Sequence, residues 1–228
     1  MERCDPFHVF GSQKVFQKPF SEARQEGSGM PDPGKTAPSR SRLGLFEPLL
    51  KHVLRDWRQS VAIRQENEHL FNSSVCTADG GFVMAYDTDD PRYVPFSVKF
   101  ARSADLRDWS KVPEAVFGKE RYAACPCIRH ADGHFYLMYT EHGTPRWFFE
   151  TWMARSRDLK DWVMSPANPL LTPGPNEDIN TSDPDVVEYR GKTYLYYSVG
   201  DQRSWAKLKR AVYPATLGEF FETCFEAR

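Results

Sequence analysis

The chain has 228 residues, with 30 lysines and arginines against 31 aspartates and glutamates, so its formal net charge is −1. This balance gives no electrostatic footprint for nucleic acid or an anionic membrane, and neither is expected as a partner. No apolar run approaches the roughly 20 residues of a membrane-spanning helix, and the first ten residues lack the pattern of a secretory signal. We therefore expect a cytoplasmic protein whose five cysteines are reduced thiols.

The first 57 residues carry weak structural signals. Residues 5–10, DPFHVF, are predicted to form a strand that opens with Asp-Pro. Residues 21–42 are rich in Gly, Pro, Ser and charge and are predicted to form a flexible loop. Residues 43–57 have apolar side chains at helical spacing, interrupted by Pro48, so a helix and a strand are both consistent with them.

From residue 70 onward the sequence repeats itself. Residues 101–109, ARSADLRDW, return as residues 154–162, ARSRDLKDW. The same displacement carries residues 79–86 onto residues 132–139, and each segment has an Asp-Gly turn followed by a strand-like run. Agreement of separate segments at one displacement indicates a structural repeat.

A third unit follows at a slightly larger displacement. Residues 180–198, NTSDPDVVEYRGKTYLYYS, read as a β-hairpin around Gly191. The first strands of the three units then begin at equivalent positions, Asn72–Ser74, Cys125–Cys127 and Asp183–Asp185. Continued to the end of the chain, the displacement places Leu217 and Phe220 on Leu159 and Trp162.

Units of about 50 residues with three or four short antiparallel strands predict an all-β fold, a β-propeller. The chain is expected to be a single domain, 1–228, with clear blades at about 70–112, 120–165 and 180–222. The aspartates of the Ser-x-Asp-Leu-x-x-Trp segments are each expected to bond the backbone of a turn, and each Trp to pack between sheets; the aspartates are Asp105, Asp108, Asp158 and Asp161. A residue that repeats from blade to blade is better explained by blade architecture than by function.

The pattern resembles the five-bladed propeller glycosidases, in particular glycoside hydrolase family 43 and relatives acting on furanosides, fructans and agar oligosaccharides. The resemblance rests on the two Ser-x-Asp-Leu-x-x-Trp segments, on the Asp-Pro opening and Tyr-rich strand of residues 183–197, and on the start Asp5-Pro6-Phe7. It covers about residues 70–221 well and residues 1–57 poorly, so the first blade could be incomplete or irregular.

The resemblance implies acidic residues at the inner strand starts, where the blades meet on the axis. Two carboxyl groups with separated pKa values flank the glycosidic bond in such enzymes. On this mapping Asp5 is the base of the first blade and Asp183 is the supporting aspartate. Asp185 lies two residues further along and is expected on the same strand face.

The expected proton donor is missing from its place, because Ala124 stands where the relatives have an acidic Glu. Glu141, two residues beyond a predicted strand, is our substitute for the acid. Asp87, Glu120 and Asp185 remain alternatives. Whether the chemistry is retaining or inverting depends on the separation of the carboxyl groups and cannot be read from sequence.

Candidate saccharide-binding residues lie near the same strand starts. They are Asn72, Arg121, Tyr122, His142, Trp147 and Trp205, with packing inside a blade as the equally weighted alternative for the two tryptophans. No metal site is predicted, because Cys-x-Cys alone is a weak signal. An axial calcium ion, which some relatives hold, is compatible with oxygen ligands, but no residue specifies one, and no cofactor is expected.

The leading hypothesis is therefore a glycoside hydrolase-like enzyme that acts on a small carbohydrate. One alternative is a glycoside phosphorylase, which would need a basic phosphate pocket built from Arg121, Arg129 or His142. Another is a non-catalytic carbohydrate-binding or scaffold propeller, which the alanine at position 124 favours. The sequence leaves the oligomeric state open.

Overall fold

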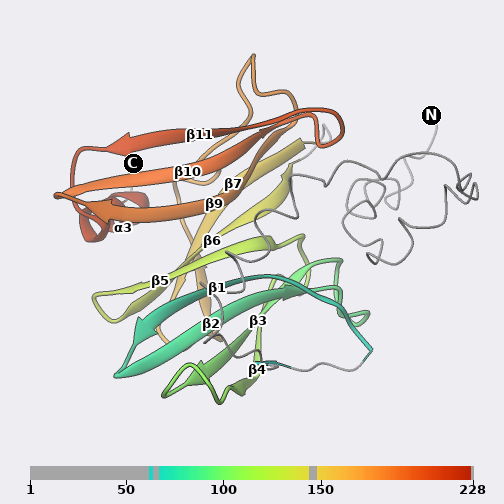
Figure 1. Ribbon diagram of the computed structural model, residues 1–228, viewed down its shortest axis with the longest axis vertical. Coiled ribbons are helices and arrows are strands. Elements are labelled where there is room, and N and C mark those ends of the chain that lie inside the picture. Colours follow the sequence, from blue (N-terminus) through green and yellow to red (C-terminus); the bar gives the residue numbers. More distant parts are fainter. Residues whose placement is uncertain (1–61, 64–66, 144–147, 227–228) are drawn as a thin grey trace, which may run out of the picture. The chain divides into compact units, whose positions relative to one another are not determined.

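The computed structural model describes residues 62–63, 67–143 and 148–226 (Figure 1). The chain divides into two compact units, residues 1–61 and 62–228, and everything described here belongs to the second. The predictions for residues 5–10, 21–42 and 43–57 lie outside the described residues.

Four strands form the first sheet, in the order β1-β2-β3-β4 with antiparallel neighbours (Figure 1). Their bounds are β1 (Leu70–Ala78), β2 (Gly81–Thr88), β3 (Ser97–Ser103) and β4 (Ser110–Phe117). The chain therefore makes a simple meander, in which each strand pairs with the strand that precedes it in the sequence.

The remaining strands form a second sheet in the order β11-β10-β9-β7-β6-β5, and β8 pairs with β7. The bounds are β5 (Ala124–Ala131), β6 (His134–Gly143), β7 (Phe148–Ser156), β8 (Trp162–Met164), β9 (Asn180–Tyr189), β10 (Lys192–Gly200) and β11 (Ala206–Tyr213). Two meanders, β5–β8 and β9–β11, are joined by a parallel bridge between Phe149 and Asn180. The described residues are thus mostly strand, as predicted. Their sheets do not close into a ring, and the number of five blades stays a prediction.

Each meander opens with the same two-residue turn. Asp79-Gly80, Asp132-Gly133 and Arg190-Gly191 all have positive φ, between 48° and 75°, at both residues. Two consecutive positive φ angles define the type I′ turn, whose twist matches that of the strands it joins. The hairpins predicted from the Gly-containing turns are confirmed at all three sites.

The Ser-x-Asp-Leu-x-x-Trp segments fold into identical turns. The Ser156 Oγ accepts hydrogen bonds from the backbone N–H groups of Asp158 (3.2 Å) and Leu159 (2.9 Å). The Asp158 carboxylate accepts from the N–H groups two and three residues later, and the Trp162 indole donates to the Leu159 carbonyl. Residues 103–109 repeat every one of these bonds. The prediction that the aspartates bond turn backbone is confirmed for the first Asp of each segment, Asp105 and Asp158.

The sheet formed by β5–β8 has a hydrophobic core on each face. Along β6, Leu137 and Tyr139 belong to the core shared with the first sheet, whereas Tyr136 and Met138 belong to the core shared with β9–β11. This alternation follows from the two-residue period of a strand. Trp162 stacks on Phe100 of the first sheet with ring centroids 5.4 Å apart, so the predicted packing of this tryptophan between sheets is confirmed.

The third unit ends in a helix, α3 (Leu217–Phe225), and not in a fourth strand. The displacement that places Leu217 and Phe220 on Leu159 and Trp162 therefore does not carry over to the structure. The physical reason is a capping box, in which Thr216 and Glu219 each bond the backbone N–H of the other. Phe221 is buried against the second core. No helix in the described ranges is long and apolar enough to cross a membrane.

Replacing Thr216 with alanine is expected to lower the free energy of unfolding by about 1 kcal/mol, because it removes the N-cap acceptor of α3. Urea denaturation followed by circular dichroism measures the change. Thr216→Ser keeps the hydroxyl and should stay close to the wild type. A serine variant as unstable as the alanine variant would show that the methyl group, and not the cap, stabilises this end of the helix.

Candidate functional site at the starts of the first strands

The first strand of each meander is irregular near its start. The register of β1 shifts between Leu70 and Ser73, and that of β5 shifts between Ala124 and Cys127. Cys125 and Asp183, at equivalent positions of β5 and β9, have positive φ angles of 51° and 52°. Residues other than glycine adopt this conformation rarely, and bulges of this kind redirect side chains.

These strand starts converge on Cys125. The Asn72 Nδ2 lies 3.6 Å from the Cys125 Sγ. Burial raises the pKa of the Cys125 thiol well above its ordinary value, and the nearby carboxylates of Asp183 and Asp87 raise it further. Side chains from β1, β2, β5 and β9 therefore meet in one cluster, which we call the axial cluster: Asn72, Asp87, Cys125 and Asp183.

Asp87 is the buried member of the axial cluster, with no exposed surface. Its Oδ1 accepts from the backbone N–H of Asn72 at 2.6 Å. Its Oδ2 accepts from the backbone N–H of Cys125 at 2.7 Å and from the Asn72 side-chain amide at 3.2 Å. Burial raises the pKa of the Asp87 carboxyl, and this effect outweighs the hydrogen bonds, which lower it.

Thr140 occupies the same place one unit later. Its Oγ1 accepts from the backbone N–H of Asp183 at 3.3 Å. The second strand of one meander thus holds the first strand of the next, through a carboxylate at Asp87 and through a neutral hydroxyl at Thr140. The repeat of residues 82–86 at 135–139, extended by one residue, relates these two positions.

Asp183 and Asp185 are both exposed, and the buried Pro184 lies between them. The predicted alternation along this strand is therefore confirmed. The Asp183 carboxylate accepts from the Ser182 hydroxyl at 2.6 Å. Asp185 is 72% exposed and forms an ion pair with Arg129 at 2.6 Å. Asp183 belongs to the axial cluster, whereas Asp185 is engaged by a guanidinium beside it.

Glu141 lies on the opposite face of β6 from Thr140. Its Oε2 accepts from the Tyr139 hydroxyl at 2.7 Å and pairs with the Arg121 guanidinium at 3.3 Å. Because Tyr139 packs toward the first sheet, Glu141 faces that sheet as well. The contact with Asp183 is made by Thr140 and not by Glu141.

Tyr122 precedes β5 and lies near enough to the axial cluster for the charges there to act on its hydroxyl. Burial raises the pKa of its hydroxyl, and the charges of Asp87 and Asp183 add to this effect. Its ring packs against Phe96 and Phe149, with centroids 5.3 and 5.8 Å apart. This packing keeps Tyr122 next to the strand starts.

The other predicted residues are placed as follows. His142 shares the Thr140 face of β6, its ring lies 6.2 Å from that of Phe149, and burial lowers its pKa. Trp205 is half-buried, follows the turn bonded by Asp201, and has the Lys207 ammonium 5.5 Å from its ring. Glu120 is exposed in a turn. Asp5 and Trp147 lie outside the described residues.

Two candidate phosphate-binding arginines already have anionic partners. Arg129 pairs with Asp185 and donates to the Val186 carbonyl at 2.8 Å. Arg121 pairs with Glu141. These contacts do not favour a phosphate pocket at either side chain. The described residues include no group of three or more His, Cys, Asp or Glu side chains placed to hold a metal ion, so nothing in them specifies an axial calcium ion.

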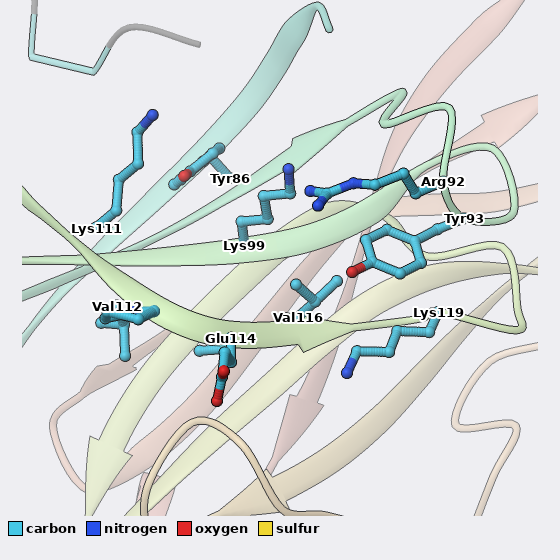
Figure 2. Close-up of a pocket in the computed structure, with 11 residues that line it drawn as sticks. Tyr86, Arg92, Tyr93, Lys99, Lys111, Val112, Glu114, Val116 and Lys119 are labelled. Carbon is cyan, nitrogen blue, oxygen red and sulfur yellow. The ribbon is translucent and has the colours of Figure 1, made fainter. Parts of the chain in front are cut away.

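A separate cleft of about 510 Å³ lies on the outer face of β3 and β4 (Figure 2). Its lining includes Tyr86, Arg92, Lys99 and Lys111, and contains none of the residues predicted as functional. Lys99 is held by two carboxylates, one of them Asp90, which also binds Arg92. Tyr86 precedes Asp87 on β2, so the cleft and the axial cluster lie on opposite faces of that strand.

Comparison with known proteins relates the fold to a class of enzymes. No protein-family model matches the chain, and no curated protein matches it by sequence. Among solved structures, it resembles a family 32 β-fructofuranosidase from Bombyx mori, solved as a mutant in complex with sucrose. The TM-score is 0.54 with 17% identity, covering 64% of this chain and 32% of that one.

A family 117 glycoside hydrolase from the marine bacterium Zobellia galactanivorans gives a TM-score of 0.51 with 16% identity, covering 67% of this chain and 56% of that one. A third structure, of another glycoside hydrolase, gives a TM-score of 0.51 with 20% identity, covering 63% of this chain and 45% of that one. The described part of the chain thus shares the fold of propeller-type glycoside hydrolases. The matched part of the chain spans 32% to 56% of the length of these proteins.

Proposed function

We propose that this protein is a glycoside hydrolase-like enzyme whose saccharide binds over the axial cluster, with Asp183 as a reacting carboxylate. The observation that carries the proposal is the convergence of three successive strand starts on Cys125, which lies next to an exposed carboxylate, Asp183, and a buried one, Asp87. The fold likeness to glycoside hydrolases supports it, although fold alone does not define function.

The chemistry assigned to Asp183 follows from its exposure. An exposed carboxylate that can approach a bound saccharide can act as a nucleophile or can activate water, and a second carboxyl group must protonate the leaving oxygen. Asp87 cannot take that second role directly, because it has no exposed surface. We propose Glu141 for it, with Asp5 and Asp185 as the remaining carboxyl groups of the sequence hypothesis.

A second candidate function is non-catalytic binding of carbohydrate. Ala124, in the place of the expected acid, is buried at the start of β5, and Glu141 is held by Arg121 on the face of β6 opposite Thr140. Both observations favour a protein that retains the binding site and has lost the proton donor.

The test is hydrolysis of a panel that begins with sucrose and nitrophenyl furanosides, assayed with the full-length protein. Asp183→Asn should lower the rate by about 10²–10⁴-fold, the range over which a positioned acid or base contributes. Asp161→Asn is the control, because it removes an exposed carboxylate that has no proposed role in the site, and it should leave the rate close to that of the wild type.

Equal rates for the wild type and Asp183→Asn would refute the assignment of Asp183. If the wild type binds saccharides without cleaving any of them, the non-catalytic function replaces the enzymatic one. Turnover that requires inorganic phosphate would instead establish a phosphorylase.

A further inference from the structure

We infer that Asp87 is a positioning residue that fixes the side-chain amide of Asn72 so that its carbonyl oxygen faces the bound saccharide. The inference rests on the proposed binding of a saccharide over the axial cluster and names the chemistry of that contact. Asp87 is completely buried, so it can act on a ligand only through the groups that it holds.

Asp87 holds both neighbouring strand starts at once. It accepts the backbone N–H of Asn72 on β1 and that of Cys125 on β5, at 2.6 and 2.7 Å. These two residues are 53 positions apart in the sequence, and their side chains lie 3.6 Å from each other. One carboxylate therefore sets the spacing of two residues in the axial cluster.

The same carboxylate determines which way the Asn72 amide points. An ionised carboxylate only accepts hydrogen bonds, so the amide must present its NH₂ group to Asp87, at 3.2 Å. The second hydrogen of that group is directed to the Cys125 Sγ. Both N–H donors of the Asn72 side chain are then in use. Because this side chain is exposed, its Oδ1 remains available to accept a hydrogen bond from a ligand.

Asn72 Oδ1 and the exposed Asp183 carboxylate give the axial cluster two hydrogen-bond acceptors. Two acceptors suit a ligand that donates two hydrogen bonds, such as neighbouring hydroxyl groups on a neutral saccharide ring. They do not suit phosphate, whose oxygens would meet carboxylate and carbonyl oxygens. The ligand class that the cluster recognises is therefore a neutral polyol.

The structural repeat supplies a matched control. Thr140 holds the next strand start with a neutral hydroxyl, and the displacement found in the sequence places Ser198 at the same position of the third unit. The described residues contain no further strand start for the Ser198 side chain to hold. Ser198→Ala therefore changes the repeated position and leaves the bonds of Asp87 to Asn72 and Cys125 in place.

The first experiment follows the amide resonances of the ¹⁵N-labelled full-length protein from pH 4 to pH 8. The Asn72 side-chain NH₂, assigned by its loss in Asn72→Ser, should titrate together with the backbone amides of Asn72 and Cys125, with one common midpoint. The response should disappear in Asp87→Asn and persist in Ser198→Ala. Separate midpoints, or no response in the wild type, would overturn the inference even if Asp87→Asn does not fold.

The second experiment measures sucrose binding by isothermal titration calorimetry. Asn72→Ala and Asp87→Asn should each weaken binding about tenfold, the usual effect of losing one hydrogen bond, and Ser198→Ala should not. Weaker binding by Asn72→Ala alone would overturn the role of Asp87, and preferential binding of inorganic phosphate would overturn the polyol assignment. If the wild type binds neither, the proposed function fails, while the titration still decides whether Asp87 positions Asn72.

Discussion

Replacing Leu159 with alanine is expected to lower the free energy of unfolding by about 2–5 kcal/mol, the range for truncating a buried leucine. Leu159 has no exposed surface and belongs to the core between the two sheets. Alanine would leave a cavity there that the surrounding strands can fill only in part. Chemical denaturation in urea measures the loss.

Leu106 provides the control within the same molecule. It has the same position in the repeated turn, a φ of 66° against 70° for Leu159, and the same bond from its N–H to a serine hydroxyl. It is, however, 52% exposed. Leu106→Ala should therefore change stability by less than about 0.5 kcal/mol. Equal losses at the two sites would mean that backbone conformation, and not burial, determines the effect.

The second large effect is expected in the pH dependence of stability. Burial raises the pKa of Asp87 in the folded protein above its ordinary value of 3.8. Between these two pKa values the folded state binds more protons than the unfolded state, so stability falls as pH rises. The stability that Asp87 contributes through its raised pKa is fully present below pH 3.8. It is lost as pH rises through the higher pKa of the folded state.

The Asp87→Asn variant isolates this contribution, because asparagine does not titrate. The free energy of unfolding of the wild type minus that of the variant should decrease with rising pH across this window, and level off above it. Carboxylates whose pKa is lowered, such as Asp90 beside Arg92 and Glu177 beside Lys209, act in the opposite direction. They are present in both proteins and cancel in the difference. A difference that grows with pH would contradict the assignment.

The parts of the fold that were predictable depend on local chemistry. The turns at Gly80, Gly133 and Gly191 follow from the need for positive φ, and the Ser-x-Asp-Leu turns follow from side chains that bond their own backbone. The helix at the end was missed because the repeat was continued past its range. The capping-box pattern from Thr216 to Glu219 was available in the sequence as the competing signal.

The candidate site was predictable only in part. Asp183 was singled out because it is acidic, whereas the residues at the equivalent positions of the other two units, Asn72 and Cys125, are not. The bond that joins Asp87 to Cys125 spans 38 residues, and no local pattern reveals a contact of that range. The side of the strand on which Glu141 lies could have been predicted from the sequence, because the two-residue period of a strand places it on the face opposite Thr140. Asp5, assigned by resemblance alone, lies outside the described residues.

The three type I′ turns also make the molecule suitable for labelling. A side chain added at Gly80, Gly133 or Gly191 would meet no atom within 4 Å, although the positive φ there favours placing a probe in an inserted residue and not on the glycine itself. Each of these turns lies at the far end of a meander's first strand. At roughly 3.3 Å per residue, the turn is about 20 Å from the start of that strand, where the candidate site lies. Fluorophores or spin labels attached at these tips could report ligand-induced changes in the distances between the sheets without touching the residues that bind the ligand.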